Sequence, residues 1–344
     1  MTPQVTTVIP GFNRVEPLKY TLRSVAAAVA ALPPGAVETI LVDDGSVPSL
    51  EEQLAGFTPG LPIRHVRQPN QGSIVARLTG LRAARGRFVL FLDSDDLIHP
   101  DKFKRQLAAM EEAGADVSYS DMARATLGLN YTVSGYAPDM VAGLATAPAD
   151  FFLRIQPAPH SPIYRRAYLD AALPGFCVPP LRALDAVGDL WLYYNLSPFP
   201  ARIVKVDAPL TAVGPHEEDR FSRHWEKLAV AALLLGEAFL DRCPVTPATL
   251  PARIQIGETA FNTWRRLSRD YHAGHNARLL ALWRRAPRGP LHRLGGPGFR
   301  LLARLLGPVN AGRVLRLRNA SYAAHRTVTA AELDALLAVR LPAP

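Results

Sequence analysis

The stretch Phe88-Val-Leu-Phe-Leu-Asp-Ser-Asp-Asp96 decides the fold class. Its first five residues are all apolar, as expected for a strand of a parallel sheet that is covered on both faces. Three carboxylates, at Asp93, Asp95 and Asp96, follow at once. Carboxylates this close repel one another unless a cation neutralises them, and oxygen ligands suit Mg²⁺ or Mn²⁺. The competing interpretation is a solvated acidic turn before the helix that follows Pro100, because negative charge is favourable near a helix N-terminus.

Strand and helix signals alternate around this stretch. Short runs with β-branched or apolar residues predict strands at 5–9, 39–42, 63–66, 88–92 and 117–119, and amphipathic periodicity predicts helices at 17–31, 73–84 and 100–112. This alternation is typical of a doubly wound α/β sheet, in which ligands bind at the carboxyl ends of the strands. A second acidic pair, Asp43-Asp44, also follows a predicted strand. The sequence therefore predicts a polar site at this edge of the sheet.

The later part of the chain changes character. Signals are weak from 127 to 159, which we expect to be irregular, before a strand at 161–164, a helix at 189–196 and a strand at 202–206. Beyond residue 221 the pattern predicts long helices at 223–242 and 253–269, followed by arginine-rich helices broken by Gly and Pro. We therefore expect two domains, a catalytic one at 1–222 and a basic, mainly helical region at 223–344.

Charge separates the same two regions. Residues 1–220 carry 20 Lys and Arg against 23 Asp and Glu, whereas residues 221–344 carry 19 against 7. Residues 265–326 contain fourteen arginines and a single acid, Asp270. Basic amphipathic helices are typical of attachment to an anionic membrane surface. The alternative is a solvated helical subdomain that packs on the catalytic domain or on a second copy in a homodimer. No nucleic-acid-binding module accompanies the charge, so nucleic acid is not an expected partner.

Location and redox state follow from what the sequence does not contain. There is no signal peptide at the printed N-terminus, and no apolar run approaches the roughly 20 residues of a membrane span. We expect a cytoplasmic protein, with peripheral attachment to the inner face of the cytoplasmic membrane as the further alternative. Cys177 and Cys243 have no other metal-ligating residue near them in sequence, which favours two reduced thiols.

Four ordered motifs resemble family 2 of the glycosyltransferases, which are inverting enzymes of the GT-A fold. They are Val8-Ile-Pro-Gly-Phe-Asn-Arg14, Ile40-Leu-Val-Asp-Asp-Gly-Ser46, the segment Asn70–Gly86 and Asp93-Ser-Asp-Asp96. Phe12 stands where the family usually has Tyr, and Leu78 where Asn is common. The first change keeps a ring that can stack on a nucleobase.

The resemblance implies a role for each matched residue. Phe12 would stack on the base, Asp43 would accept from a base N–H of uracil or thymine type, and Arg77 would reach the base or phosphates. Asp93 would approach the ribose and the metal, and Asp95 would ligate Mn²⁺ or Mg²⁺. The donor-binding set is Pro10, Phe12, Asn13, Arg14, Asp43, Asp44, Gly72, Arg77, Asp93 and Ser94.

The resemblance also suggests a catalytic base and a third metal ligand. Gly188-Asp-Leu-Trp-Leu is similar to a family segment whose Asp deprotonates the acceptor, with Gly188 in place of Glu. Asp189 is the expected base, Asp185 is the competitor, and a helix N-cap is the structural alternative for Asp189. His216 lies in a loop where many relatives have His, so it is a candidate for the metal or the diphosphate.

The expected function is metal-dependent, inverting transfer of a sugar from a UDP- or dTDP-linked donor. The acceptor would be a hydroxyl of a saccharide or a lipid-linked molecule in cell-envelope polysaccharide synthesis. A nucleotidyltransferase is the alternative enzyme, although Pro10–Arg14 is a poor phosphate loop. A catalytically inactive carbohydrate- or membrane-binding relative is the alternative outside enzymes.

Overall fold

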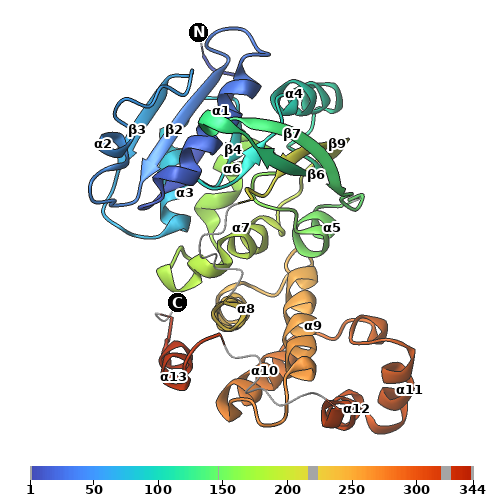
Figure 1. Ribbon diagram of the computed structural model, residues 1–344. Coiled ribbons are helices and arrows are strands. Elements are labelled where there is room, and N and C mark those ends of the chain that lie inside the picture. The colour runs from blue at the N-terminus through green and yellow to red at the C-terminus, as the bar shows by residue number, and fades with distance from the viewer. Residues whose placement is uncertain (1, 146, 216–223, 319–326, 342–344) are drawn as a thin grey trace. The chain divides into compact units, whose positions relative to one another are not determined.

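The computed structural model describes residues 2–145, 147–215, 224–318 and 327–341, which form two compact units (Figure 1). The first unit takes residues up to 176, then 180–185 and 199–215. The second takes 177–179, 186–198 and the described residues from 224 onward. The helix that contains Asp189 therefore groups with the second unit, although it precedes the last strand of the sheet.

The first unit is built on a mixed sheet of nine strands, counted over the described residues. Their order is β3-β2-β1-β4-β8-β6-β9-β5, with β7 paired to β6. The strands are β1 (Val5–Gly11), β2 (Val37–Asp43), β3 (Ile63–Arg67), β4 (Phe88–Phe91), β5 (Leu97–Ile98), β6 (Val117–Leu127), β7 (Val133–Met140), β8 (Ile163–Arg165) and β9 (Ile203–Ala212). β1 to β4 are mutually parallel, whereas β8 runs antiparallel to β4 and β6. The expected doubly wound mixed sheet is confirmed.

One sequence-based expectation for this unit is wrong. The stretch from 127 to 159 is not irregular, because β6 extends to Leu127 and β7 pairs with it antiparallel. β7 reads Val-Ser-Gly-Tyr-Ala-Pro-Asp-Met and is mostly exposed. Gly, Pro and Asp are depleted in strands, and an edge strand has no buried face to impose an apolar alternation. The pairing with β6 therefore outweighs a weak local signal.

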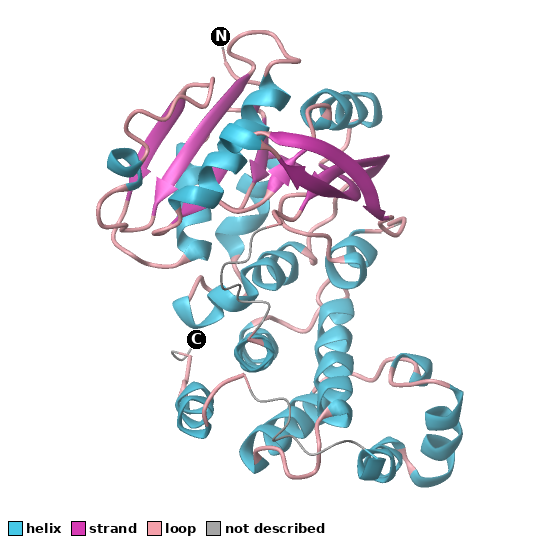
Figure 2. Cartoon of the chain, in the orientation of Figure 1, coloured by secondary structure: helices cyan, strands magenta, loops and turns pink. Residues whose placement is uncertain are grey.

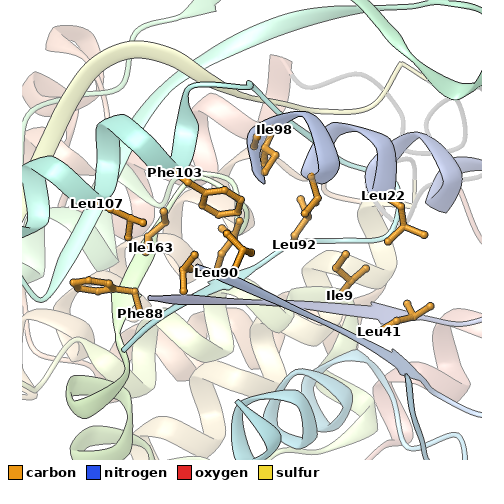
Figure 3. Packing of buried hydrophobic residues seen from close by; sticks show 14 of the residues in the cluster. Ile9, Leu22, Leu41, Phe88, Leu90, Leu92, Ile98, Phe103, Leu107 and Ile163 are labelled. Carbon is orange, nitrogen blue, oxygen red and sulfur yellow. The ribbon is translucent and has the colours of Figure 1, made fainter. Parts of the chain in front are cut away.

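Helices cover both faces of the parallel half of the sheet. α1 (Val15–Val29) and α4 (Lys102–Ala113) lie on one face, and α3 (Ser73–Ala83) lies on the other. The remaining helices of this unit are α2 (Leu50–Gln53), α5 (Pro148–Asp150) and α6 (Arg166–Ala172). Leu22 of α1 and Phe103 of α4 pack with Ile9, Leu41 and Leu90 in one buried cluster, as Figure 3 shows. Fully burying such a side chain contributes about 1.5–3 kcal/mol each. This cluster fixes the strands that carry the acidic residues.

α3 covers the opposite face at very close range. A Cβ added to Gly80 would lie 2.2 Å from Cγ1 of Val8 in β1. Only a residue without a side chain allows the helix to approach the strand this closely. That contact sets the position of α3, whose N-terminus and Arg77 face the carboxyl ends of the strands described below.

The described part of the second unit is helical (Figure 2). Its helices are α7 (Gly188–Leu196), α8 (Trp225–Arg242), α9 (Leu250–Arg266), α10 (Ala273–Arg285), α11 (Pro297–Leu306), α12 (Pro308–Leu315) and α13 (Ala330–Ala338). Among the described residues, no helix combines the length and apolar character that a bilayer crossing requires.

Some of the arginines in this unit have structural roles. Arg316 is buried, lies with its guanidinium 4.7 Å from the ring centroid of Trp264, and donates from Nε to the carbonyl of Leu267 at 2.9 Å. Arg278 pairs with Glu237 of α8 at 2.5 Å. The basic composition is therefore divided between arginines that hold helices together and arginines that face solvent.

The two cysteines, far apart in sequence, are neighbours in the second unit. The interaction between the two thiol groups lowers the pKa of Cys177 and raises that of Cys243. Cys177 is also partly exposed, whereas Cys243 is buried. No local pattern signals this contact, because Cys177 precedes α7 and Cys243 ends α8.

We expect iodoacetamide to alkylate Cys177 before Cys243 near neutral pH, because the thiolate is the nucleophile and a lower pKa enlarges its fraction. Peptide mass spectrometry after timed quenching measures both rates. Substituting Cys243→Ser removes the thiol that lowers the pKa of Cys177 and should slow the modification of Cys177. Equal rates at the two thiols in the unmodified protein would contradict this assignment.

Candidate functional site

The carboxyl ends of β1, β2 and β4 meet at one edge of the sheet. Gly11 of β1 pairs with Asp43 of β2, and Val8 pairs with Phe91 of β4, all in parallel register. The residues that follow each strand are therefore brought together, as the sequence pattern predicts. They include the loop after β1, the Asp43-Asp44 pair and the turn that begins at Asp93.

Two arginines neutralise the acidic turn. Arg14 Nη1 lies 2.7 Å from Asp95 Oδ2, and Arg77 Nη2 of α3 lies 2.5 Å from Asp93 Oδ1. The side chains of Asp93 and Asp95 are 30% and 17% exposed, which does not fit a freely solvated acidic turn. The carboxylates are held in place at a partly covered edge of the sheet, where they remain reachable from solvent.

The third acid of the turn has a different environment. Asp96 is buried, accepts from the backbone N–H of Gly214 at 3.2 Å, and has Oδ2 at 2.8 Å from Nδ1 of the fully buried His160. Sequence reasoning did not identify His160, because a single histidine in a stretch without clear periodicity carries no signal. Asp96 therefore anchors the turn inward, whereas Asp93 and Asp95 face the edge.

Asp43 and Asp44 organise the loops around the site. Asp43 is buried and accepts from the backbone N–H groups of Ser46 at 2.8 Å and Leu50 at 3.0 Å. Each of its oxygens still has a second lone pair that a ligand can use.

Asp44 ties β2 to the segment before α3. It accepts from the side-chain amide of Gln68 at 2.7 Å and from the backbone N–H groups of Gln71 at 2.9 Å and Gly72 at 2.8 Å. Gln68 is buried and was not identified from the sequence. A buried carboxylate with three donors holds this loop in a single arrangement.

The loop after β1 presents an aromatic ring. Asn13 has φ of 51°, a left-handed conformation that Asn tolerates better than most residues. Its backbone N–H donates to Ser46 Oγ at 3.0 Å, and its Oδ1 accepts from Val47 N at 3.2 Å. Phe12 is 45% exposed beside this fixed residue, whereas Pro10 and Ser94 are buried. Phe12 is therefore available to a ligand and is not a core residue.

Asp185 lies at the N-terminus of α3. The residue before this helix, Gly72, has φ of +96° and has no side chain with which to cap the helix. Asp185 Oδ1 instead accepts from Ile74 N at 3.2 Å and from Ser73 Oγ at 3.4 Å. A Cβ on Gly72 would lie 1.8 Å from Asp185 Oδ2, so only glycine fits. Burial raises the pKa of the Asp185 carboxyl.

Asp189 belongs to the other compact unit, in the first turn of α7. The N-cap of this helix is Val187, so Asp189 does not fill the capping position. Trp191, two residues on, is buried and donates from Nε1 to the carbonyl of Val178 at 2.9 Å, which fixes the start of the helix.

The described residues contain no cluster of three or more Asp, Glu, His or Cys side chains arranged to hold a metal ion. Asp93 and Asp95 contribute two carboxylates, and His216, the third expected ligand, lies outside the described residues. The metal assignment of Asp93, Asp95 and His216 therefore stays a prediction.

Comparison with known protein families shows which family the residues of this site resemble. Residues 6–170 match the family described as "Glycosyl transferase family 2". This stretch, just under half of the chain, is therefore similar to a family 2 glycosyltransferase domain. The match covers the loop after β1, Asp43-Asp44, Gly72, Arg77 and the acidic turn, which are the motifs that carry the resemblance in the sequence.

Two curated relatives with 31% to 32% identity match over about a third of the chain. An uncharacterized glycosyltransferase of Rickettsia conorii is 32% identical over 109 residues, which is 32% of this chain and 17% of that protein. The succinoglycan biosynthesis protein ExoO of Rhizobium meliloti is 31% identical over 121 residues, 35% of this chain and 33% of that protein. The chain thus spans well under half the length of these two relatives.

Among solved structures, S. aureus TarS 1-349 is similar over both units. It matches with a TM-score of 0.60 at 20% identity, covering 91% of this chain and 90% of that one. The same TarS fragment has been determined in complex with UDP-GlcNAc, at a TM-score of 0.60 and 19% identity. This likeness confirms the expected GT-A-like fold with a helical C-terminal region.

Proposed function

We propose that this protein is an inverting glycosyltransferase that transfers a sugar from a UDP- or dTDP-linked donor to a hydroxyl of a saccharide or lipid-linked acceptor. The observation that carries the proposal is the pair of Asp–Arg contacts at the carboxyl ends of β1 and β4, Arg14 with Asp95 and Arg77 with Asp93. A bound diphosphate can replace the carboxylates as the partner of the two arginines, and a cation can replace the arginines as the partner of the two carboxylates. The name of ExoO, a succinoglycan biosynthesis protein, supports a place in cell-envelope polysaccharide synthesis.

The residues fit a nucleoside diphosphate in their chemistry. Guanidinium groups bind phosphate oxygens in a bidentate manner, so Arg14 and Arg77 would turn from the carboxylates to the diphosphate. Phe12 would stack on the base, and the free lone pairs of Asp43 would accept from a base N–H. TarS in complex with UDP-GlcNAc supports a donor of this class.

The donor set also fits a divalent cation, because Asp93 and Asp95 offer carboxylate oxygens, the ligands that Mg²⁺ and Mn²⁺ prefer. Each of the two acids already balances one positive group in the structure. We propose that Asp93 and Asp95 hold Mn²⁺ or Mg²⁺, with His216 as the candidate third ligand. When bound, the cation would offset the charge that develops on the leaving nucleoside diphosphate.

The chain's own acid–base group completes the chemistry. The acceptor hydroxyl would attack the anomeric carbon in line with the leaving diphosphate, and Asp189 would take the hydroxyl proton as the new bond forms. A single displacement inverts the configuration at that carbon. Asp185 is the weaker candidate, because its carboxylate already caps α3.

The direct test is turnover of nucleotide sugars by the purified protein with Mn²⁺ or Mg²⁺. We expect one UDP- or dTDP-sugar to release nucleoside diphosphate, by slow hydrolysis if no acceptor is present. Metal-dependent binding of the donor without any turnover, even with acceptor extracts, would favour a catalytically inactive relative. Formation of a nucleotide sugar and pyrophosphate from a nucleoside triphosphate and a sugar phosphate would favour a nucleotidyltransferase.

A further inference from the structure

The outward side of α11 and α12 exposes large apolar side chains beside arginines. Leu301 is 62% exposed and Leu305 is 73% exposed, although both lie in an ordered helix. We call this surface the leucine–arginine face. It consists of Leu301, Leu305 and Leu306 of α11, Val314 of α12 and Leu317 just after α12, together with Arg300, Arg304 and Arg313. Single exposed leucines are ordinary on a protein surface, but a group of this size in two consecutive helices is not.

The apolar side of α11 is wider than the part that its own fold buries. Only Phe299 and Ala303 are buried in this helix. Successive residues of a helix advance by about 100°, so Leu306, Leu302, Leu305 and Leu301, in that order, continue the apolar arc away from the buried pair. The arc ends at Arg300 and Arg304, which are one turn apart. Part of the apolar side of α11 is therefore left exposed by the helical unit and is available to a partner outside it.

The inner sides of both helices are fixed, so the exposure is not a result of loose packing. The rings of Phe299 and Phe261 lie 5.9 Å apart, and the guanidinium of Arg265 lies 5.2 Å from the Phe299 centroid. In α12, Gly312 packs so closely on α9 that an added Cβ would lie 2.5 Å from Cζ3 of Trp264. α11 and α12 also pack against each other. The leucine–arginine face is thus a preformed surface.

The charge beside the exposed leucines indicates what kind of partner this face binds. From 271 to 331 the sequence contains no Asp or Glu, so all the formal charge next to the exposed leucines is positive. A second copy of this chain would bring arginines against arginines. A nucleic acid would match the arginines, but it would leave the leucines in water. An anionic phospholipid bilayer satisfies both, because leucines enter the acyl boundary while arginines meet the phosphate headgroups.

We propose that the leucine–arginine face binds this protein to the surface of an anionic phospholipid bilayer, with α11 lying in the plane of the membrane–water interface. The sequence indicates membrane attachment only for the basic region as a whole, and this proposal assigns it to the leucine–arginine face. It does not depend on the transfer activity, because it uses only residues of the helical unit.

Vesicle flotation with the full chain tests the proposal. We expect the protein to float with vesicles of phosphatidylcholine and phosphatidylglycerol and not with phosphatidylcholine alone. The double variant Leu301→Glu/Leu305→Glu should reduce the bound fraction at least about tenfold, because it removes apolar contact and adds repelled charge. Arg300→Gln/Arg304→Gln should weaken binding less and make the remainder less sensitive to salt. The matched control Leu129→Glu/Leu144→Glu changes two exposed leucines of the first unit, 86% and 73% exposed, and should bind normally.

Three results would overturn the proposal. The unmodified protein does not bind the anionic vesicles, the control variant loses as much binding as Leu301→Glu/Leu305→Glu, or light scattering shows a lipid-free oligomer that this variant dissociates. The last result would assign the face to self-association. Unchanged thermal unfolding and metal-dependent UDP binding of each variant establish that the fold and the donor site are intact, so a failure here is distinct from a failure of the proposed function.

Discussion

Substituting Asp95→Ala is expected to abolish metal-dependent binding of UDP. Asp95 supplies one of the two carboxylates at the edge of the sheet that are proposed to hold the cation, and it also balances Arg14 at 2.7 Å. Without it the cation loses a ligand, and the diphosphate loses the charge that the cation provides. We expect the affinity for UDP in the presence of Mn²⁺ to fall at least about a hundredfold, which corresponds to about 2.8 kcal/mol. Isothermal titration calorimetry measures this directly.

A matched control separates this effect from the general loss of an ion pair. Asp139→Ala removes the partner of Arg124, an exposed Asp–Arg pair of 2.8 Å between β6 and β7. Exposed ion pairs contribute little to stability, so this variant should bind UDP and Mn²⁺ like the unmodified protein. Tight, metal-dependent UDP binding by Asp95→Ala would refute the assignment of Asp95 as a metal ligand.

The parallel half of the sheet could be predicted from sequence because its central strands are short runs of β-branched and apolar residues. Val5–Ile9 and Phe88–Leu92 are buried on both faces, so their composition alone identifies them. The acidic residues then had to lie at one edge, because parallel neighbours end at the same side. That reasoning located Asp43, Asp44, Asp93 and Asp95 correctly at the carboxyl ends of β2 and β4.

The contacts that hold these residues could not be predicted, because they join distant segments. Asp185 reaches α3 over 111 residues of sequence to accept from Ile74, and His160 meets Asp96 from a stretch with no clear periodicity. Neither pairing follows from spacing or propensity, which describe only local structure. The thiols of Cys177 and Cys243 are a third case, because their contact depends on how α7 and α8 pack in the second unit.

The edge strand β7 and the arginines of the helical region show a second limit of prediction from sequence. β7 was missed because a mostly exposed strand needs no apolar alternation, and it is held in the sheet by its pairing with β6. In the helical region, composition indicates a basic surface but does not distinguish Arg316, which is buried against Trp264, from Arg304, which is exposed. Only packing separates structural arginines from those available to a partner.

Substituting Asp189→Ala is expected to stop sugar transfer while leaving donor binding unchanged. Loss of a general base typically reduces the rate by about 10²–10⁴-fold. Asp189 lies in the first turn of α7 but does not fill its N-cap position, which is Val187. The measurements are initial transfer rates and calorimetry with UDP and Mn²⁺ on the same preparation.

The decisive comparison is with Asp185→Ala. Asp185 caps α3 through the backbone N–H of Ile74, so its loss should lower the free energy of unfolding by about 0.5–2 kcal/mol. Urea denaturation measures this change. If Asp189 is the base, Asp185→Ala loses stability but still transfers sugar, whereas Asp189→Ala binds UDP and is inactive. If Asp185→Ala binds UDP but has lost transfer while Asp189→Ala remains active, the roles are reversed, and the carboxylate that caps α3 is itself the base.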